Sequence, residues 1–136
     1  MSRVINPDSA GKERTQLSKS IVLAVRELAR QPGIDDKTRD LAAFISLALF
    51  RVDATIDVSV QAWEKRGYWV KADKFRMDWL WAGQYAVKMK QAVLAEDWAQ
   101  VAVLSVQAGQ KLSKIKIAEH HRLGTPWVGA YKKLLE

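Results

Sequence analysis

Three carboxylates lie close together on one face of the helix that the sequence predicts around residue 57. Asp53, Asp57 and Glu64 fall within about 40° of one another, since successive helical residues turn by about 100°. Such a group could ligate a metal ion or perform acid-base chemistry. Helical carboxylate metal sites also use Glu-x-x-His pairs, however, and the histidines here, His120 and His121, are adjacent and point about 100° apart. We therefore expect salt bridges from these carboxylates to cations of the first helix, and a carboxylate metalloenzyme is the alternative.

Other catalytic patterns are missing from the sequence. It has no cysteine, which excludes disulfides, thiolate catalysis and cysteine-ligated metal and is typical of a reducing cytoplasm. The Gly11-Lys12 pair lacks the spacing of a phosphate-binding loop, and no serine has a histidine and an acid in a pattern typical of nucleophilic catalysis. We predict a protein without enzymatic activity, with no catalytic residue, metal or cofactor.

Residues 63–81 form the most unusual segment. They contain four of the six tryptophans, a tyrosine, a phenylalanine and five basic residues. Aromatic faces beside cations suit a nucleic acid, whose bases stack and whose phosphates attract lysine and arginine, and they also suit a protein interface. Helical phase assigns Trp63 and Trp79 to core stripes, which leaves Trp69 at a corner and Trp81 outside the stripe. The predicted stacking or interface residues are Tyr68, Trp69, Trp81, Tyr85 and Trp127.

Some of these residues share one flank of the third predicted helix. Lys74, Trp81, Tyr85 and Lys88 fall roughly 80° to 140° from its core stripe. One interpretation is a cationic aromatic strip for nucleic-acid bases or for another subunit. The other is a second buried stripe, because each helix of a bundle touches two neighbours.

Basic residues are concentrated in two parts of the chain, whose formal net charge is +7. One group surrounds Gly67, and the other lies near the C-terminus. In an up-down-up-down bundle the fourth helix ends at the same pole as the turn between the second and third helices. We therefore expect the two groups of basic residues to share this pole. The alternative is two ordinary solvated faces. The predicted nucleic-acid-binding residues are Lys65, Arg66, Lys71, Lys74, Arg76, Lys88, Lys111, Lys114, Arg122, Lys132 and Lys133.

The composition and periodicity of the sequence predict helices. An apolar content of 49% with only seven glycines and three prolines is typical of a folded helical domain. Apolar residues spaced by three and four predict long helices over residues 8–31, 36–66, 71–94 and 97–121. A short fifth helix follows the stop at residues 124–126, and its predicted apolar side consists of Trp127, Val128, Tyr131 and Leu135.

The expected fold is a single all-α domain over residues 1–136. It is an antiparallel up-down-up-down four-helix bundle with an N-terminal arm over residues 1–8 and a short C-terminal helix or tail over residues 125–136. The N-terminus has no apolar signal core, and the longest charge-free apolar run, residues 41–50, has about half the length of a bilayer span. We expect a soluble cytoplasmic protein with no membrane partner.

The layout of the chain resembles that of a family of small basic four-helix proteins. Residues 71–76 read Lys-x-Asp-Lys-Phe-Arg at the entry to the third helix, and residues 123–127, Leu-Gly-Thr-Pro-Trp, are similar to a Leu-Gly-Gly-Trp signature. The family comprises the 23S rRNA intervening-sequence proteins and the accessory variability determinants of diversity-generating retroelements. The resemblance implies a ring-like homo-oligomer whose basic surface binds nucleic acid and, in the retroelement case, a reverse transcriptase.

The residues and the resemblance indicate the same function. We expect a basic helical protein that binds RNA or DNA as a homo-oligomer or as an accessory subunit. The alternative is a protein-protein adaptor or structural subunit that uses an aromatic interface without nucleic acid.

Overall fold

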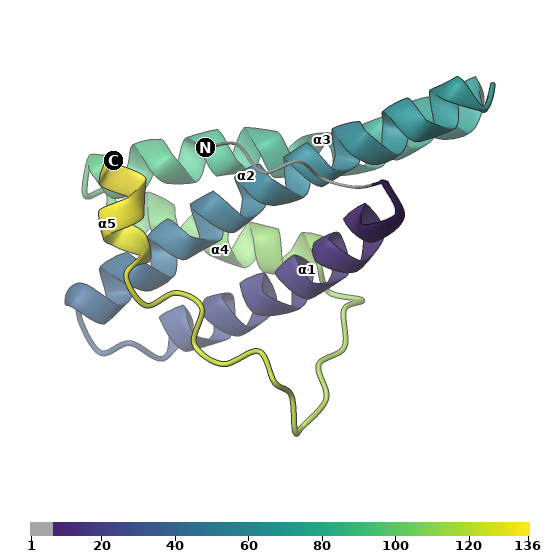
Figure 1. Cartoon of the computed structure of the whole chain (residues 1–136). Helices are drawn as coiled ribbons and strands as arrows, with labels where there is room; N and C mark the ends of the chain where they lie inside the picture. Colours follow the sequence, from purple (N-terminus) through teal and green to yellow (C-terminus); the bar gives the residue numbers. More distant parts are fainter. Residues whose placement is uncertain (1–6) are drawn as a thin grey trace.

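The computed structural model describes residues 7–136, and within this range the protein is helical with no strand (Figure 1). This confirms the all-α class. Residues 1–6 of the predicted N-terminal arm lie outside the described residues, whereas residues 7 and 8 already belong to the first helix. The helices are α1 (Pro7–Ala29), α2 (Asp36–Lys65), α3 (Trp69–Leu94), α4 (Trp98–Lys111) and α5 (Ala130–Leu135).

Two of the predicted helix starts are confirmed by their caps. The side chain of Asp35 accepts a hydrogen bond of 3.0 Å from the Thr38 backbone N–H at the start of α2. The side chain of Asp97 accepts one of 3.1 Å from the Gln100 N–H at the start of α4. Each carboxylate thereby satisfies a backbone donor that has no partner within its helix and also places negative charge at the positive end of the helix dipole.

α1 and α2 pack side by side in opposite directions. Near the start of α1, Glu13 accepts a hydrogen bond of 2.8 Å from Arg51 Nε. Near its end, Glu27 Oε2 lies 3.6 Å from Lys37 Nζ. Residues early in α1 therefore face residues late in α2.

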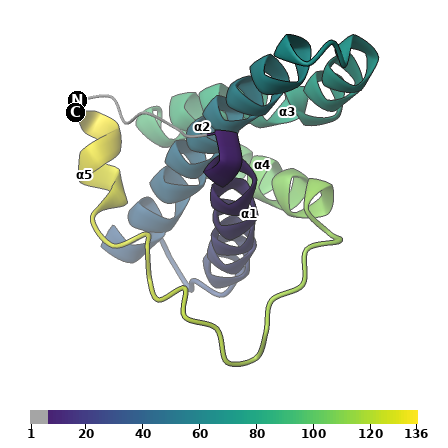
Figure 2. The same cartoon turned by 45° about the vertical axis from the view of Figure 1, so that its right-hand side comes forward.

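α2 and α3 form the longest helical hairpin of the molecule (Figures 1 and 2). The Ser46 hydroxyl donates a hydrogen bond of 2.8 Å to the carbonyl of Ala86, and Arg76 Nη2 donates one of 3.1 Å to Glu64 Oε2. Small side chains on α3 let the two backbones approach closely. The small residues Ala72, Ala82 and Ala86 of α3 are fully buried.

The core consists of one large cluster and one small cluster. The large cluster includes buried residues of all five helices. The small cluster contains Ile56, Val60 and Ala72 and lies between the distal halves of α2 and α3. Buried apolar residues that follow the three-and-four spacing of the sequence are Ile21, Ala24, Leu41, Ile45, Ala48, Val52, Ile56, Ala82, Ala86, Met89, Val93, Val101, Leu104, Ala108 and Leu112.

The fourth helix is much shorter than predicted. It ends at Lys111, not near His121, and residues 112–129 form a long connection that passes across the bundle (Figures 1 and 2). Ile115 and Ile117 both pack against the core although they are two positions apart. In extended backbone, alternate residues face the same side. The spacing of these two isoleucines therefore fits an extended segment and not a continuation of α4.

The C-terminal segment returns to the first turns of α2. Both oxygens of Asp40 accept backbone hydrogen bonds from it, one of 3.1 Å from Gly129 N–H and one of 3.0 Å from Tyr131 N–H. The prediction of Trp127 as a stacking or interface residue is wrong, because this side chain is only 6% exposed and belongs to the core. Gly129 adopts φ +81°, and this left-handed residue separates Trp127 from α5.

The predicted apolar side of the tail is also partly wrong. Val128 and Leu135 are exposed, whereas Ala130 and Leu134 are the buried residues of α5. None of the helices within residues 7–136 is long and apolar enough to cross a bilayer.

The close approach of α2 to α3 predicts a strong effect of Gly83→Ala. A Cβ at residue 83 would lie 2.9 Å from Cγ of Asp53, so either the short Asp53 side chain or one of the two helices must shift. We expect Gly83→Ala to lower the free energy of unfolding by about 1–3 kcal/mol, as overpacking does. Urea unfolding followed by circular dichroism measures this change.

The same substitution should behave differently once the obstructing side chain is removed. In an Asp53→Ala background, Gly83→Ala should be neutral or should stabilise by up to about 1 kcal/mol, because alanine has the higher helix propensity. Gly11→Ala in α1 is a second control, since an added Cβ there meets only the Arg14 side chain at 3.8 Å. Equal losses from Gly83→Ala in both backgrounds would contradict the steric explanation.

Candidate functional site

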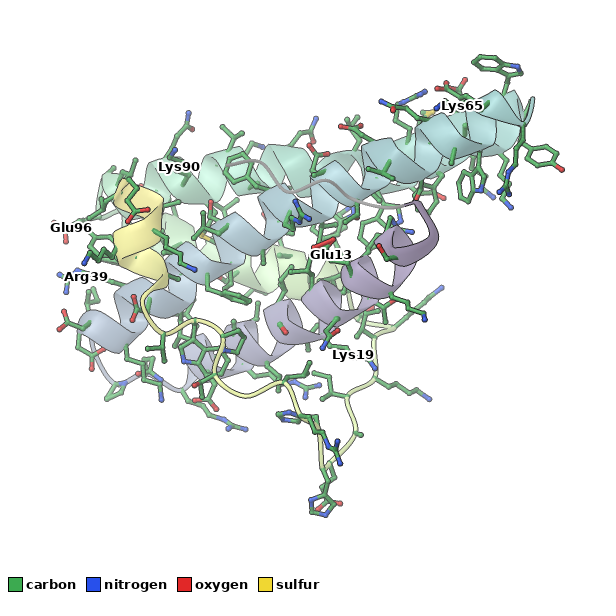
Figure 3. All side chains as sticks on the ribbon, viewed as in Figure 1. Glu13, Lys19, Arg39, Lys65, Lys90 and Glu96 are labelled. Carbon is green, nitrogen blue, oxygen red and sulfur yellow. The ribbon has the colours of Figure 1, made fainter. Side chains whose placement is uncertain are left out.

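The turn between α2 and α3 projects from the molecule. α2 has 30 residues and α3 has 26, whereas α4 has 14, so the hairpin extends beyond the end of α4. Figure 1 shows this turn at the far end from α5, and Figure 3 marks it with Lys65. We call residues 61–76 the hairpin tip.

Two aromatic side chains are exposed at the hairpin tip. Trp69 is 62% exposed and Tyr68 is 53% exposed, whereas the other tryptophans of residues 7–136 are partly or fully buried. Trp69 is the first residue of α3 and therefore lies directly at the turn. The structure thus leaves a large aromatic side chain accessible to a ligand.

The charge of the hairpin tip is strongly positive. It contains five cations and two acids, and both acids pair with Arg76: Glu64 at 3.1 Å and Asp73 at 2.6 Å. In the part of the chain that the structure describes, Lys65, Arg66 and Lys74 make no ion pair, and each is exposed.

The remaining aromatic residues of the hairpin tip support its structure. Trp63 contacts Phe75 edge-on at 4.8 Å between ring centroids, and Lys71 Nζ lies 4.7 Å from the Trp63 ring centroid. Arg14 of α1 lies 4.8 Å from the Phe75 centroid and donates to the Thr55 hydroxyl at 3.3 Å. Trp63 therefore packs within the protein, as its predicted place in a core stripe requires.

Sequence reasoning missed the contribution of Arg14 to this region. Its guanidinium reaches across to α2, where it also donates to Ser59 Oγ at 3.3 Å, and burial lowers the pKa of this side chain from its ordinary value. Nothing local in the sequence distinguishes this arginine from the other cations of α1. Its position opposite a serine and a threonine of α2 depends on the tertiary pairing of the helices.

The flank containing Trp81 and Tyr85 is packed within the protein. Trp81 is partly buried and stacks on Trp79 at 5.9 Å, and Tyr85 contacts Trp81 edge-on at 5.8 Å. Lys88 Nζ lies 5.8 Å from the Tyr85 ring centroid. This arrangement favours the interpretation of Trp81 and Tyr85 as a second packing stripe over that of a free stacking strip.

The two groups of basic residues do not share a pole. α5, which carries Lys132 and Lys133, is bound to Asp40 at the start of α2, about 38 Å along that helix from Lys65. The expected shared pole is wrong, because the chain turns back after the short α4. Lys111 is the last residue of α4, and this end of α4 packs against α1, where Gly109 lies against Val25. Lys114 and Arg122 are exposed on the connection between α4 and α5.

The three predicted carboxylates have different surroundings. Glu64 is paired with Arg76 of α3, so the expected pairing with a cation of α1 is wrong for this residue. The carboxylate of Asp53 faces Gly83, and Asp57 is exposed. Among residues 7–136, no three His, Asp or Glu side chains are grouped closely enough to hold a metal ion.

Burial changes the acidity of Asp53. Desolvation is the main cause that raises the pKa of its carboxyl group, and the negative charge of Asp57 raises this pKa further. No hydrogen bond to this carboxylate is found in the described part of the chain to offset its loss of water.

Comparison with known proteins found no relatives of this chain. No family model, no curated protein and no solved structure matches it. The candidate site is therefore defined by the residues of the hairpin tip alone.

The raised pKa of Asp53 predicts a pH-dependent stability. The pKa of Asp53 is higher in the folded state than in the unfolded state, so the ionised carboxylate destabilises the fold. The lost stability is recovered as the pH falls through the folded-state pKa and the carboxylate becomes protonated. Asp53→Asn should therefore raise the free energy of unfolding at neutral pH. The gain should shrink and disappear below the ordinary aspartate pKa of about 3.9. Urea unfolding of both proteins across this pH range measures the effect.

A second substitution separates the two causes of the shift. Asp57→Asn removes the neighbouring charge and should lower the pKa of Asp53, leaving the part that is due to burial. Titration of the Asp53 carboxyl carbon by NMR reports this pKa directly. A pKa of Asp53 at or below the ordinary value would show that the carboxylate is solvated.

Proposed function

We propose that the protein binds nucleic acid through the hairpin tip, as a non-enzymatic accessory protein. The observation that carries the proposal is the 62% exposed Trp69 among Lys65, Arg66 and Lys74, three cations that have no acidic partner within residues 7–136. Lysine and arginine attract phosphates, and an exposed indole stacks on a base. In our proposal the rest of the molecule, an antiparallel up-down-up-down four-helix bundle, is the scaffold that presents the tip.

The shape of the site favours unpaired bases. A base must leave its own stack before an aromatic side chain can cover its face, and this is easiest in a single strand. The tip consists of the end of α2, a short turn and the start of α3, and its exposed aromatic residues lie at this turn and not along a helical face that could enter the groove of a duplex. We therefore propose single-stranded RNA or DNA as the ligand class, which agrees with the nucleic-acid binding implied by the resemblance of the layout.

The proposal predicts strongly salt-dependent binding of single strands. Fluorescence anisotropy with labelled oligouridine, oligothymidine and a duplex of equal length, across a salt series, measures it. We expect the two single strands to bind more tightly than the duplex, and their comparison shows whether the sugar matters. Trp69→Ala should weaken binding by about 5-fold to 150-fold, since stacking contributes about 1–3 kcal/mol per base.

A charge-matched pair of variants tests where the strand lies. The double variant Lys65→Ala/Lys74→Ala should reduce the slope of log affinity against log salt by about 1.4, or about 0.7 for each lost phosphate contact. Lys132→Ala/Lys133→Ala removes the same charge from α5, at the other end of α2, and should leave the slope nearly unchanged. Equal effects of the two double variants would show attraction by net charge alone, and no binding at low salt would refute the proposal.

A further inference from the structure

α3 also carries an exposed apolar stripe that has no partner among the described residues, 7–136. Its apolar members are spaced by seven, three, seven and seven residues, as in the a and d positions of a heptad repeat. Polar residues occupy the three remaining positions of the same stripe, Asp73, Gln84 and Gln91. The exposed apolar residues are Val70 (85% exposed), Met77 (74%), Leu80 (56%), Val87 (45%) and Leu94 (47%), and we call them the outer stripe.

The outer stripe is separate from the face that α3 uses in the core. At about 100° per residue, Met77 and Leu80 point roughly 120° to 180° away from the buried Ala82 and Ala86. The stripe extends over about 36 Å of helix at 1.5 Å per residue. Solvated helices of globular proteins are polar on their outer side, and an apolar stripe of this length marks a contact with another helix even with three polar positions in it.

Lysines line both edges of the outer stripe. Lys74 and Lys88 occupy two e positions of the heptads, with Trp81 at the e position between them, and Lys90 occupies a g position, as does Arg76. Figure 3 shows Lys90 pointing away from the bundle. Arg76 is bound to Glu64 and Asp73, whereas the three lysines make no ion pair in the described part of the chain. The e and g positions decide which helix a heptad seam accepts.

We propose that the outer stripe docks an amphipathic helix of a partner protein, with apolar residues at its a and d positions and acidic residues at its e and g positions. The charge of the two edges selects this occupant. A second copy of α3 would present lysine, arginine or neutral residues at every e and g position, so no acid would be available to pair in either orientation. Apolar burial along the stripe then supplies affinity, and the lysines supply specificity.

A synthetic helical peptide tests this proposal. The probe is a fluorescein-labelled peptide of four heptads with Leu at a and d, Glu at e and g, and Ala or Gln elsewhere, and the control is a scrambled peptide of the same composition. We expect the heptad peptide to bind and to lose affinity as salt increases, while the scrambled peptide binds at least tenfold more weakly. Equal binding of the two peptides would overturn the proposal.

Two variants with the same change of charge locate the bound peptide. Leu80→Glu should weaken binding of the heptad peptide at least tenfold, because it places an acid in the centre of the outer stripe. Val106→Glu on α4 is the matched control, since Val106 is 55% exposed and Leu80 is 56% exposed. It should leave affinity within about twofold, and circular dichroism should show the same helix content for both variants. Equal affinities of the two variants would place the peptide elsewhere and overturn the proposal.

The remaining outcomes separate this inference from the other occupant and from the proposed function. A dimer that forms at high salt, measured by light scattering, and that Leu80→Glu disrupts would identify a second copy as the occupant and overturn the proposal. Trp69→Ala should retain peptide binding, and Leu80→Glu should retain most of the binding of single-stranded nucleic acid. Failure of one of the two proposals therefore leaves the other measurable.

Discussion

The close packing of α2 against α3 is the constraint on which the other features depend. Gly83 gives the carboxylate of Asp53 room against the α3 backbone, and the Ser46 hydroxyl binds the carbonyl of Ala86 within the same seam. Two helices can pack this closely only where the residues between them are small. The close packing then holds α2 and α3 together without large side chains between them. A hairpin built in this way can extend beyond the rest of the bundle.

The distal part of the hairpin must be stabilised by few neighbours. α4 is too short to cover it, so the aromatic residues Trp63, Phe75 and Trp79 fill the space between α2 and α3, and Arg14 of α1 closes one side. This accounts for half of the aromatic residues in the unusual segment of the sequence. Trp69 alone among the described tryptophans is mostly exposed, because it lies where the chain turns and no third helix reaches it.

The parts of the fold that were predictable depend on local sequence. Apolar spacing along α2 and α3 and the caps Asp35 and Asp97 are set by neighbours three or four residues away, so they can be inferred without tertiary structure. The burial of Trp127 depends on Asp40. The hydrogen bonds of Asp40 join it to backbone N–H groups that lie 89 and 91 positions later in the chain. No local pattern encodes that contact, and it is the contact that separates Lys132 and Lys133 from the hairpin tip. Among the predicted site residues, Trp69 and its basic neighbours are exposed as a site requires, whereas Trp127 is not.

α3 therefore has three faces with different physical tasks. One is buried against α2, one carries the packed Trp81 and Tyr85, and one is the outer stripe, with the exposed Trp69 at its N-terminal end. Both proposed ligands are anionic, and Lys74 lies at the border between the hairpin tip and the outer stripe. Two anions bound within a Debye length of about 8 Å repel each other, and they would also compete for the same lysine. A nucleic acid at the tip would thus lower the affinity for an acidic helix along the stripe, and by linkage the helix would lower the affinity for the nucleic acid by the same factor. α3 would then exchange one ligand for the other and would not bind both at once.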